Sequence, residues 1–113
     1  MKTITLNLKE RIRLADIIGS QEVPSVGMQR EFLRLHEAVE LSEAEAKEVG
    51  LTVDAVRGYV AWERDDGRNY SIDLSDSQAA ILAAVLNNEG GRFKLALRLR
   101  EDAWALRVLE QLA

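Results

Sequence analysis

A unit of one strand, one polar cap and one amphipathic helix occurs twice in this chain, and it constrains the fold more than any other feature. The two copies read ITLNLKERIRLADII at residues 4–18 and IDLSDSQAAILAAVL at residues 72–86. Asn7 with Glu10 and Ser75 with Gln78 have capping-box spacing, in which the two side chains satisfy backbone N–H groups at the start of a helix. The pattern therefore predicts where two strands end and two helices begin.

Apolar periodicity and turn residues predict the other elements. Apolar residues at 3/4 spacing predict helices over about 8–18, 26–39 and 76–87. Ser42 with Glu45 is a third capping box, which opens a short acidic helix ending at Gly50. Alternating residues predict strands at 2–6, 59–63 and 69–74, and residues 51–57 carry no clear signal.

The strands and helices together predict an α+β fold in a single domain, residues 1–113. We expect a small antiparallel sheet of about three strands packed with four or five helices, and strand 2–6 beside strand 69–74. Asp65-Asp66-Gly67 predicts a tight hairpin turn between strands 59–63 and 69–74, because Asp-Gly tolerates positive φ angles.

The last segment, RFKLALRLREDAWALRVLEQLA, fits two structures. Its composition favours one long helix over about 92–112, which is our expectation. The alternative is a strand at 93–99 followed by a helix at 101–112, because the apolar residues at 93–99 alternate.

The long helix would carry two apolar stripes, whereas a helix packed on one domain normally needs one. The spare stripe predicts a homodimer with an interface at one or more of four residues: Leu95, Leu99, Leu106 and Leu109.

Composition places the chain among ordinary globular proteins. At 113 residues it can bury a core, and its apolar fraction of 47% is close to the average for that class. It has no cysteine, no apolar run long enough to span a membrane, and no signal-peptide core in MKTITLNLKER. We therefore expect a cytoplasmic protein without a membrane partner.

Catalytic and metal-binding patterns are weak. His36 is the only histidine, and with Glu40 it offers two ligands where zinc needs three or four. No G-x-S-x-G surrounds a serine, and Gly90-Gly91 fits no phosphate-loop pattern. We expect no enzyme activity, no metal site and no cofactor.

Charge is distributed unevenly. Five glutamates lie between residues 37 and 48, and four basic residues lie between 92 and 100. Arg64 and Arg68 flank the expected hairpin tip and are candidate phosphate contacts in a nucleic-acid-binding regulator. The net charge of −4 and the acids at the same tip argue against nucleic acid as a partner.

Four pieces of the chain resemble small, uncharacterised accessory proteins of tailed phages and prophages. These pieces, about half of the chain, are LNLKERIRLADII, LSEAEAKEVGL, YVAWE and IDLSDSQAAILAAVL. The resemblance implies a mobile-element setting and an accessory or interaction role, and it brings no site residues.

The function expected from the sequence is a non-enzymatic protein-interaction or assembly protein. One alternative is the nucleic-acid-binding regulator. The other is an inhibitor of a host or defence protein that makes contact through the acidic residues 37–48.

Overall fold

The two strand–cap–helix units meet through their strands. Strand β1 (Lys2–Asn7) pairs antiparallel with β4 (Asn69–Leu74), which confirms the expected neighbourhood of these two segments. Helices α1 (Leu8–Gly19) and α4 (Asp76–Leu86) follow them directly, and both begin with complete capping boxes. The local signal in the sequence therefore marks both strand ends correctly.

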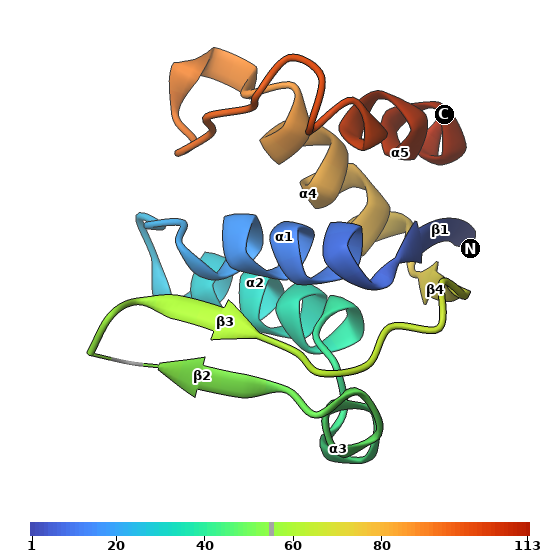
Figure 1. Ribbon diagram of the computed structural model, residues 1–113. Coiled ribbons are helices and arrows are strands. Elements are labelled where there is room, and N and C mark those ends of the chain that lie inside the picture. Colours follow the sequence, from blue (N-terminus) through green and yellow to red (C-terminus); the bar gives the residue numbers. More distant parts are fainter. Residues whose placement is uncertain (55) are drawn as a thin grey trace.

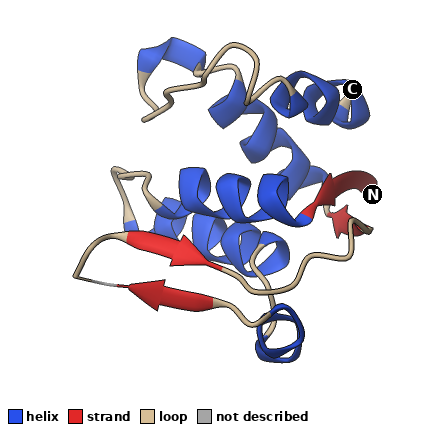
Figure 2. Ribbon diagram, in the orientation of Figure 1, coloured by secondary structure: helices blue, strands red, loops and turns tan. Residues whose placement is uncertain are grey.

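The computed structural model describes residues 1–54 and 56–113 (Figure 1). The fold is α+β, as predicted, and Figure 2 shows two separate short ribbons of strands, one near the N-terminus and the other on the outer side of the helices. The other elements are α2 (Val26–Val39), α3 (Glu43–Val49), β2 (Thr52–Asp54), β3 (Tyr59–Ala61), a single 3-10 turn η1 (Glu89–Gly91) and α5 (Trp104–Leu112).

One face of the β1–β4 ribbon forms part of the hydrophobic core. Its buried side chains are Ile4, Leu6, Ile72 and Leu74, and they join apolar residues from α1, α2, α4 and α5. Burying a side chain of this size stabilises a fold by about 1.5–3 kcal/mol. Helix α5 contacts β1, and the Gln111 side chain accepts the Thr5 backbone N–H at 3.0 Å.

The predicted pairing of residues 59–63 with 69–74 is wrong. β3 pairs instead with β2, so the chain forms two two-stranded sheets. The turn of this hairpin depends on Asp54, whose carboxylate accepts the N–H groups of Val56 and Arg57 and whose carbonyl accepts that of Gly58. This geometry closes the hairpin about ten residues before the predicted turn.

Asp65-Asp66-Gly67 does turn the chain, but in the connection from β3 to β4. The Asp65 carboxylate accepts the Gly67 N–H, and the Asp66 carboxylate accepts the Arg68 N–H. Gly67 has φ +77°, as the Asp-Gly signal predicts. The predicted turn geometry at Gly67 is therefore confirmed. The hairpin of strands 59–63 and 69–74 that this turn was expected to close does not form in residues 59–74, all of which the structure describes.

The predicted long helix over 92–112 is also wrong. Three residues with positive φ angles, Asn88, Gly90 and Gly91, prevent a continuous helix after α4, and residues 92–103, all described, form neither helix nor strand. The alternative strand at 93–99 is therefore wrong as well. The Gln21 side chain bonds both the N–H and the carbonyl of Lys94, which fixes this segment in an irregular path. Only the part at 104–112 is the expected helix.

None of the helices formed by residues 1–54 and 56–113 is both long enough and apolar enough to cross a membrane.

Candidate interaction groove

The hairpin made by β2 and β3 has one apolar face. Val53 lies opposite Val60 in the register, and Leu51 and Trp62 extend the same face by two residues along each strand. This inner face is directed at α1 across open space, because all four residues line a hollow that is also lined by α1. Val53 is 68% exposed and Val60 is 40% exposed, so the face is only partly covered.

The hollow between the hairpin and α1 forms a groove. Its volume is about 660 Å³, and it runs from Lys9 near the start of α1 to Ser20 just beyond its end. Figure 1 shows the hairpin on one side of α1 and the C-terminal segment on the other. The apolar walls are Ile12, Ala15, Leu41, Leu51, Val53, Val60 and Trp62, and the charged or polar edges include Lys9, Arg13, Asp16, His36 and Glu40.

The hairpin is attached at its base to the end of α3. Gly50 ends that helix in the left-handed conformation, and the Val49 carbonyl accepts the N–H groups of Glu63 and Arg64 at 2.9 Å each. The Arg64 guanidinium donates to the Glu48 and Lys47 carbonyls in the last turn of α3, where helix carbonyls lack i+4 N–H partners. Apart from this base, the strands pack mainly on each other.

Buried Arg11 forms part of the groove lining and connects three helices. Its guanidinium donates to the carbonyls of Val39 and Glu40 at the end of α2, at 2.6 and 2.9 Å. It also forms a bidentate ion pair with the Glu45 carboxylate, with distances of 2.8 and 3.2 Å. The groove therefore has a rigid base built from α1, the end of α2 and the start of α3.

The Arg11 pair changes the acidity of Glu45. Hydrogen bonds from the Arg11 side chain, the largest cause, lower the pKa of Glu45 to about 2, and partial burial opposes the effect. Further hydrogen bonds come from Ser42, whose capping box includes Glu45. Glu45 is thus a charged structural anchor at neutral pH.

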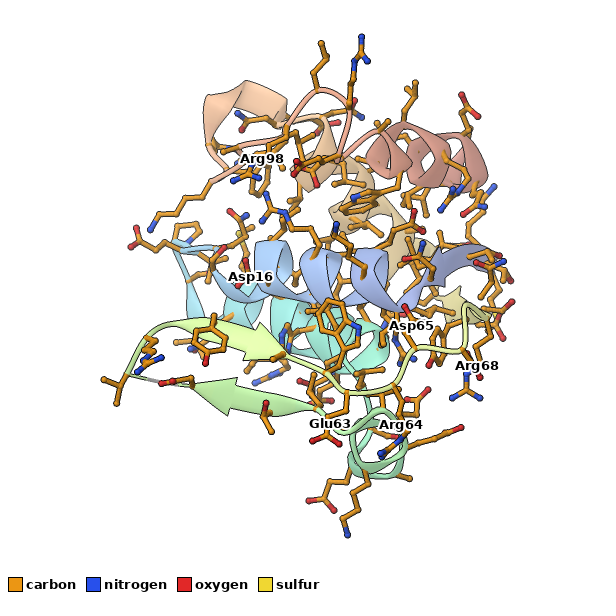
Figure 3. All side chains as sticks on the ribbon, viewed as in Figure 1. Asp16, Glu63, Arg64, Asp65, Arg68 and Arg98 are labelled. Carbon is orange, nitrogen blue, oxygen red and sulfur yellow. The ribbon has the colours of Figure 1, made fainter. Side chains whose placement is uncertain are left out.

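The two arginines predicted as nucleic-acid contacts have partners within the protein. Arg68 pairs with Glu48 at 2.9 Å, and its guanidinium lies over the Tyr70 ring, whose other cationic neighbour is Arg11. The hydrogen bond to Glu48, together with the one to the Tyr70 hydroxyl, raises the pKa of Arg68 further above its usual value. Figure 3 places Arg64 beside α3 and Arg68 nearer to β4, so neither flanks the hairpin tip as predicted.

The four predicted interface leucines separate into two pairs. Leu95 and Leu109 are partly buried and pack against the core. Leu99 and Leu106 are 92% and 64% exposed. The continuous stripe that would join them is missing, because residues 92–103 are not helical.

A polar cluster fixes the C-terminal segment on the other side of α1. The Asp102 carboxylate accepts the Arg98 N–H at 2.8 Å and the Trp104 indole N–H at 3.2 Å, and Arg13 lies at 3.6 Å. Burial raises the pKa of Asp102, but these donors outweigh burial and hold the pKa below its usual value. The arrangement positions the start of α5 and leaves Asp102 fully partnered.

His36 lies at the side of the groove near α1. Its Nδ1 atom is 3.4 Å from the Glu40 carboxylate, the i, i+4 pair noted in the sequence. A Cβ on Gly19 would lie 3.1 Å from the His36 ring, so the imidazole packs closely on α1. Among the described residues, no group of three or more His, Cys, Asp or Glu side chains could hold a metal ion.

Comparisons with protein-family models, with curated proteins and with solved structures find no match to this chain.

The groove itself was missed by the sequence analysis, although part of its signal was readable. Leu51 and Val53 alternate, as do Val60 and Trp62, and Asp54 with Gly58 could close a turn between them. That the resulting apolar face stays apart from α1 depends on how α3 orients the hairpin, which the sequence pattern does not contain.

Proposed function

We propose that this chain is a non-enzymatic protein-interaction or assembly protein that binds through the groove between the β2–β3 hairpin and α1. The observation that carries the proposal is the uncovered inner face of the hairpin, centred on the Val53–Val60 pair. Contiguous exposed apolar surface bordered by polar residues is typical of interaction sites.

The groove chemistry supports a protein ligand. Its walls are aliphatic and aromatic, and its edges carry both signs of charge, Lys9 and Arg13 as well as Asp16 and Glu40. Mixed charge around an apolar centre matches the composition of protein interfaces, whereas a nucleic-acid surface would be mainly basic. The tailed-phage setting and the cytoplasmic location remain predictions from the sequence.

The other two functions have less support. Arg64 and Arg68 are hydrogen-bonded within the molecule, which favours a structural role over phosphate contacts. Within the acidic segment, Glu45 pairs with Arg11 and Glu48 with Arg68, so part of its charge is already neutralised.

The proposal can be tested with a displayed peptide library. We expect the protein, immobilised at low density so that copies stay apart, to enrich peptides with apolar anchors. Val53→Glu should weaken their binding at least tenfold in fluorescence anisotropy, because a carboxylate would enter an apolar contact. The matched control is Leu99→Glu, which changes a 92% exposed leucine outside the groove and should bind like the wild type.

Enriched peptides that bind Val53→Glu as tightly as the wild type would place the binding surface elsewhere. A selection without any enrichment would also contradict a peptide-binding groove.

A further inference from the structure

We infer that the groove receives the β2–β3 hairpin of a second copy, so that two chains exchange hairpins across a two-fold axis. The inference rests on the proposed function and names its partner. It starts from the hairpin tip, where Val56 is 97% exposed and Arg57 extends into solvent beside Asp54. A protruding apolar tip and an apolar groove thus belong to the same surface.

This combination is self-complementary. In a two-fold interface the same surface patch on each chain meets its own copy, so each protruding part must face a matching hollow. The hairpin provides the protrusion, and the groove, of about 660 Å³, provides the hollow beside it. One two-fold operation fills both grooves and covers both tips.

The contact would stabilise the whole hairpin and not only its tip. A two-stranded ribbon is marginally stable by itself in water, and β2 and β3 contain three residues each. In the exchanged arrangement the inner faces of the two ribbons meet around the axis, so that Val53 and Val60 of both copies are buried together. A helix on one side and a ribbon on the other then complete the layered packing that a sheet face requires.

Charge at the tip is compatible with the edges of the groove. Arg57 is a cation at the protruding end, and the groove edge, which carries both signs of charge, offers it the Glu40 carboxylate and the Asp16 carboxylate, which is 3.5 Å from Arg13. Each chain has a net charge of −4, so an arginine that approaches carboxylates of the other copy offsets part of the repulsion between chains.

The first test is sedimentation equilibrium from about 1 to about 100 μM, the range in which a micromolar dimer forms. We expect the wild type to dimerise and Val56→Glu to associate at least tenfold more weakly. Val56 is 97% exposed, so its replacement leaves the monomer fold unchanged. Leu99→Glu, at 92% exposure, is the matched control and should dimerise like the wild type.

Two results would overturn the inference. One is a wild type that stays monomeric at about 100 μM. The other is a dimer that survives Val56→Glu but is lost in Leu106→Glu, because that result would place the contact on α5.

The second test identifies the contact directly. The chain has no cysteine, so single-cysteine variants report one pair of positions without background. We expect chains with Val56→Cys to form a mixed disulfide with chains carrying Lys9→Cys or Asp16→Cys, two positions along the edge of the groove. The control pairs Val56→Cys with Leu99→Cys, because residue 99 belongs to the segment between η1 and α5, which lies on the other side of α1 from the hairpin (Figure 1). A disulfide needs Cα atoms within about 7 Å, so equal yields in all pairs would overturn the exchange.

Different results would contradict the interaction function and the exchange of hairpins. A monomeric wild type that still binds peptides through Val53 leaves the interaction function in place and removes the second copy as the partner. A monomer without any groove-dependent ligand removes both.

Discussion

At the scale of single residues, Arg11 is the side chain on which the most elements depend. It is buried, it donates to two carbonyls at the end of α2, and it pairs in bidentate fashion with Glu45 at the start of α3. Removing one partner of a buried pair is costly because it leaves an uncompensated charge. The sequence shows Arg11 only as one polar residue of an amphipathic helix.

The pair predicts a pH dependence of stability. The pKa of Glu45 is about 2 in the folded protein against 4.5 as the reference. A carboxylate whose pKa is lower in the folded protein contributes its full stabilisation at pH values above the reference pKa. That contribution is lost as the pH falls from about 4.5 through 2. Since one pKa unit equals about 1.4 kcal/mol and Glu45 is partly exposed, we expect Glu45→Gln to cost about 1–3 kcal/mol at pH 7.

Urea denaturation between pH 7 and pH 2.5 measures this effect. The gap between wild type and Glu45→Gln should narrow below about pH 4.5 as the wild-type carboxylate becomes protonated. Glutamine keeps the capping box with Ser42, so the variant isolates the charge. Glu43→Gln, an exposed neighbour in the same turn, should show almost no change, and a constant gap at all pH values would contradict the argument.

Substitutions at two glycines, Gly50 and Gly67, distinguish the cost of backbone strain from the cost of close packing. Gly50 and Gly67 both have left-handed φ angles, +66° and +77°, which cost a residue with a Cβ about 1–2 kcal/mol. A Cβ on Gly50 would lie 3.0 Å from the Glu63 side chain, whereas one on Gly67 would meet nothing within 4 Å. Gly50→Ala should therefore lower the free energy of unfolding more than Gly67→Ala. Equal losses in thermal denaturation would show that Glu63 moves aside.

At the scale of elements, the two capped helices start from opposite ends of one ribbon. Asn7 is opposite Asn69 at one end, and Ser75 follows Leu74, which is opposite Lys2 at the other. Strands of six residues span about 20 Å, so the two caps are too far apart to share contacts. The similarity of the two units in sequence thus corresponds to an antiparallel arrangement in space.

Separation of the caps predicts additive energies. Asn7→Ala and Ser75→Ala should each lower the free energy of unfolding by about 0.5–2 kcal/mol, because each leaves a backbone N–H of the first turn without its acceptor. The double variant should equal the sum within about 0.5 kcal/mol in urea denaturation. A clear deviation from additivity would indicate that the ribbon transmits strain between its ends.

Local signals explain which elements could be predicted from the sequence. Caps and apolar periodicity act within one or two turns, and they gave all three capping boxes and the bounds of α2 correctly. The partner of strand 59–61 was not predictable in this way, because hydrogen bonds from Glu63 and Arg64 to Val49 orient the hairpin. The prediction for residues 92–103 failed for the same reason, because the Gln21 side chain, distant in sequence, forms hydrogen bonds with the Lys94 backbone.

The candidate site was less predictable than the fold. Its walls come from three separate segments, α1, the end of α2 and residues 51–62. Alternation at Leu51, Val53, Val60 and Trp62 shows that one face is apolar, but apolar faces are normally covered. That this face remains open follows only from the tertiary arrangement. The predicted leucine stripe shows the opposite error, because Leu95 and Leu109 pack on the core of their own chain.

At the scale of the whole molecule, the chain has a core and an attached arm. The β1–β4 ribbon and the helices share one continuous apolar cluster, whereas the hairpin touches the rest mainly at its base. Local stability follows the number of buried contacts that must be broken to open a segment. The hairpin should therefore open far more easily than the ribbon, unless a partner covers it.

Native-state amide hydrogen exchange tests this division and its link to association. Amides of the β1–β4 ladder should exchange with a free energy near that of global unfolding, and those of the β2–β3 ladder with a much smaller one. Raising the protein concentration from about 1 to about 100 μM, the range in which a micromolar dimer forms, should slow exchange in the hairpin because a second copy covers it. Amides of the β1–β4 ladder that exchange through local openings inside one chain serve as the internal control, because a second copy does not cover them. Hairpin protection equal to that of the ribbon at about 1 μM, where a micromolar dimer is largely dissociated, would show that the arm belongs to the cooperative core, because a segment held only at its base has too few buried contacts to resist opening.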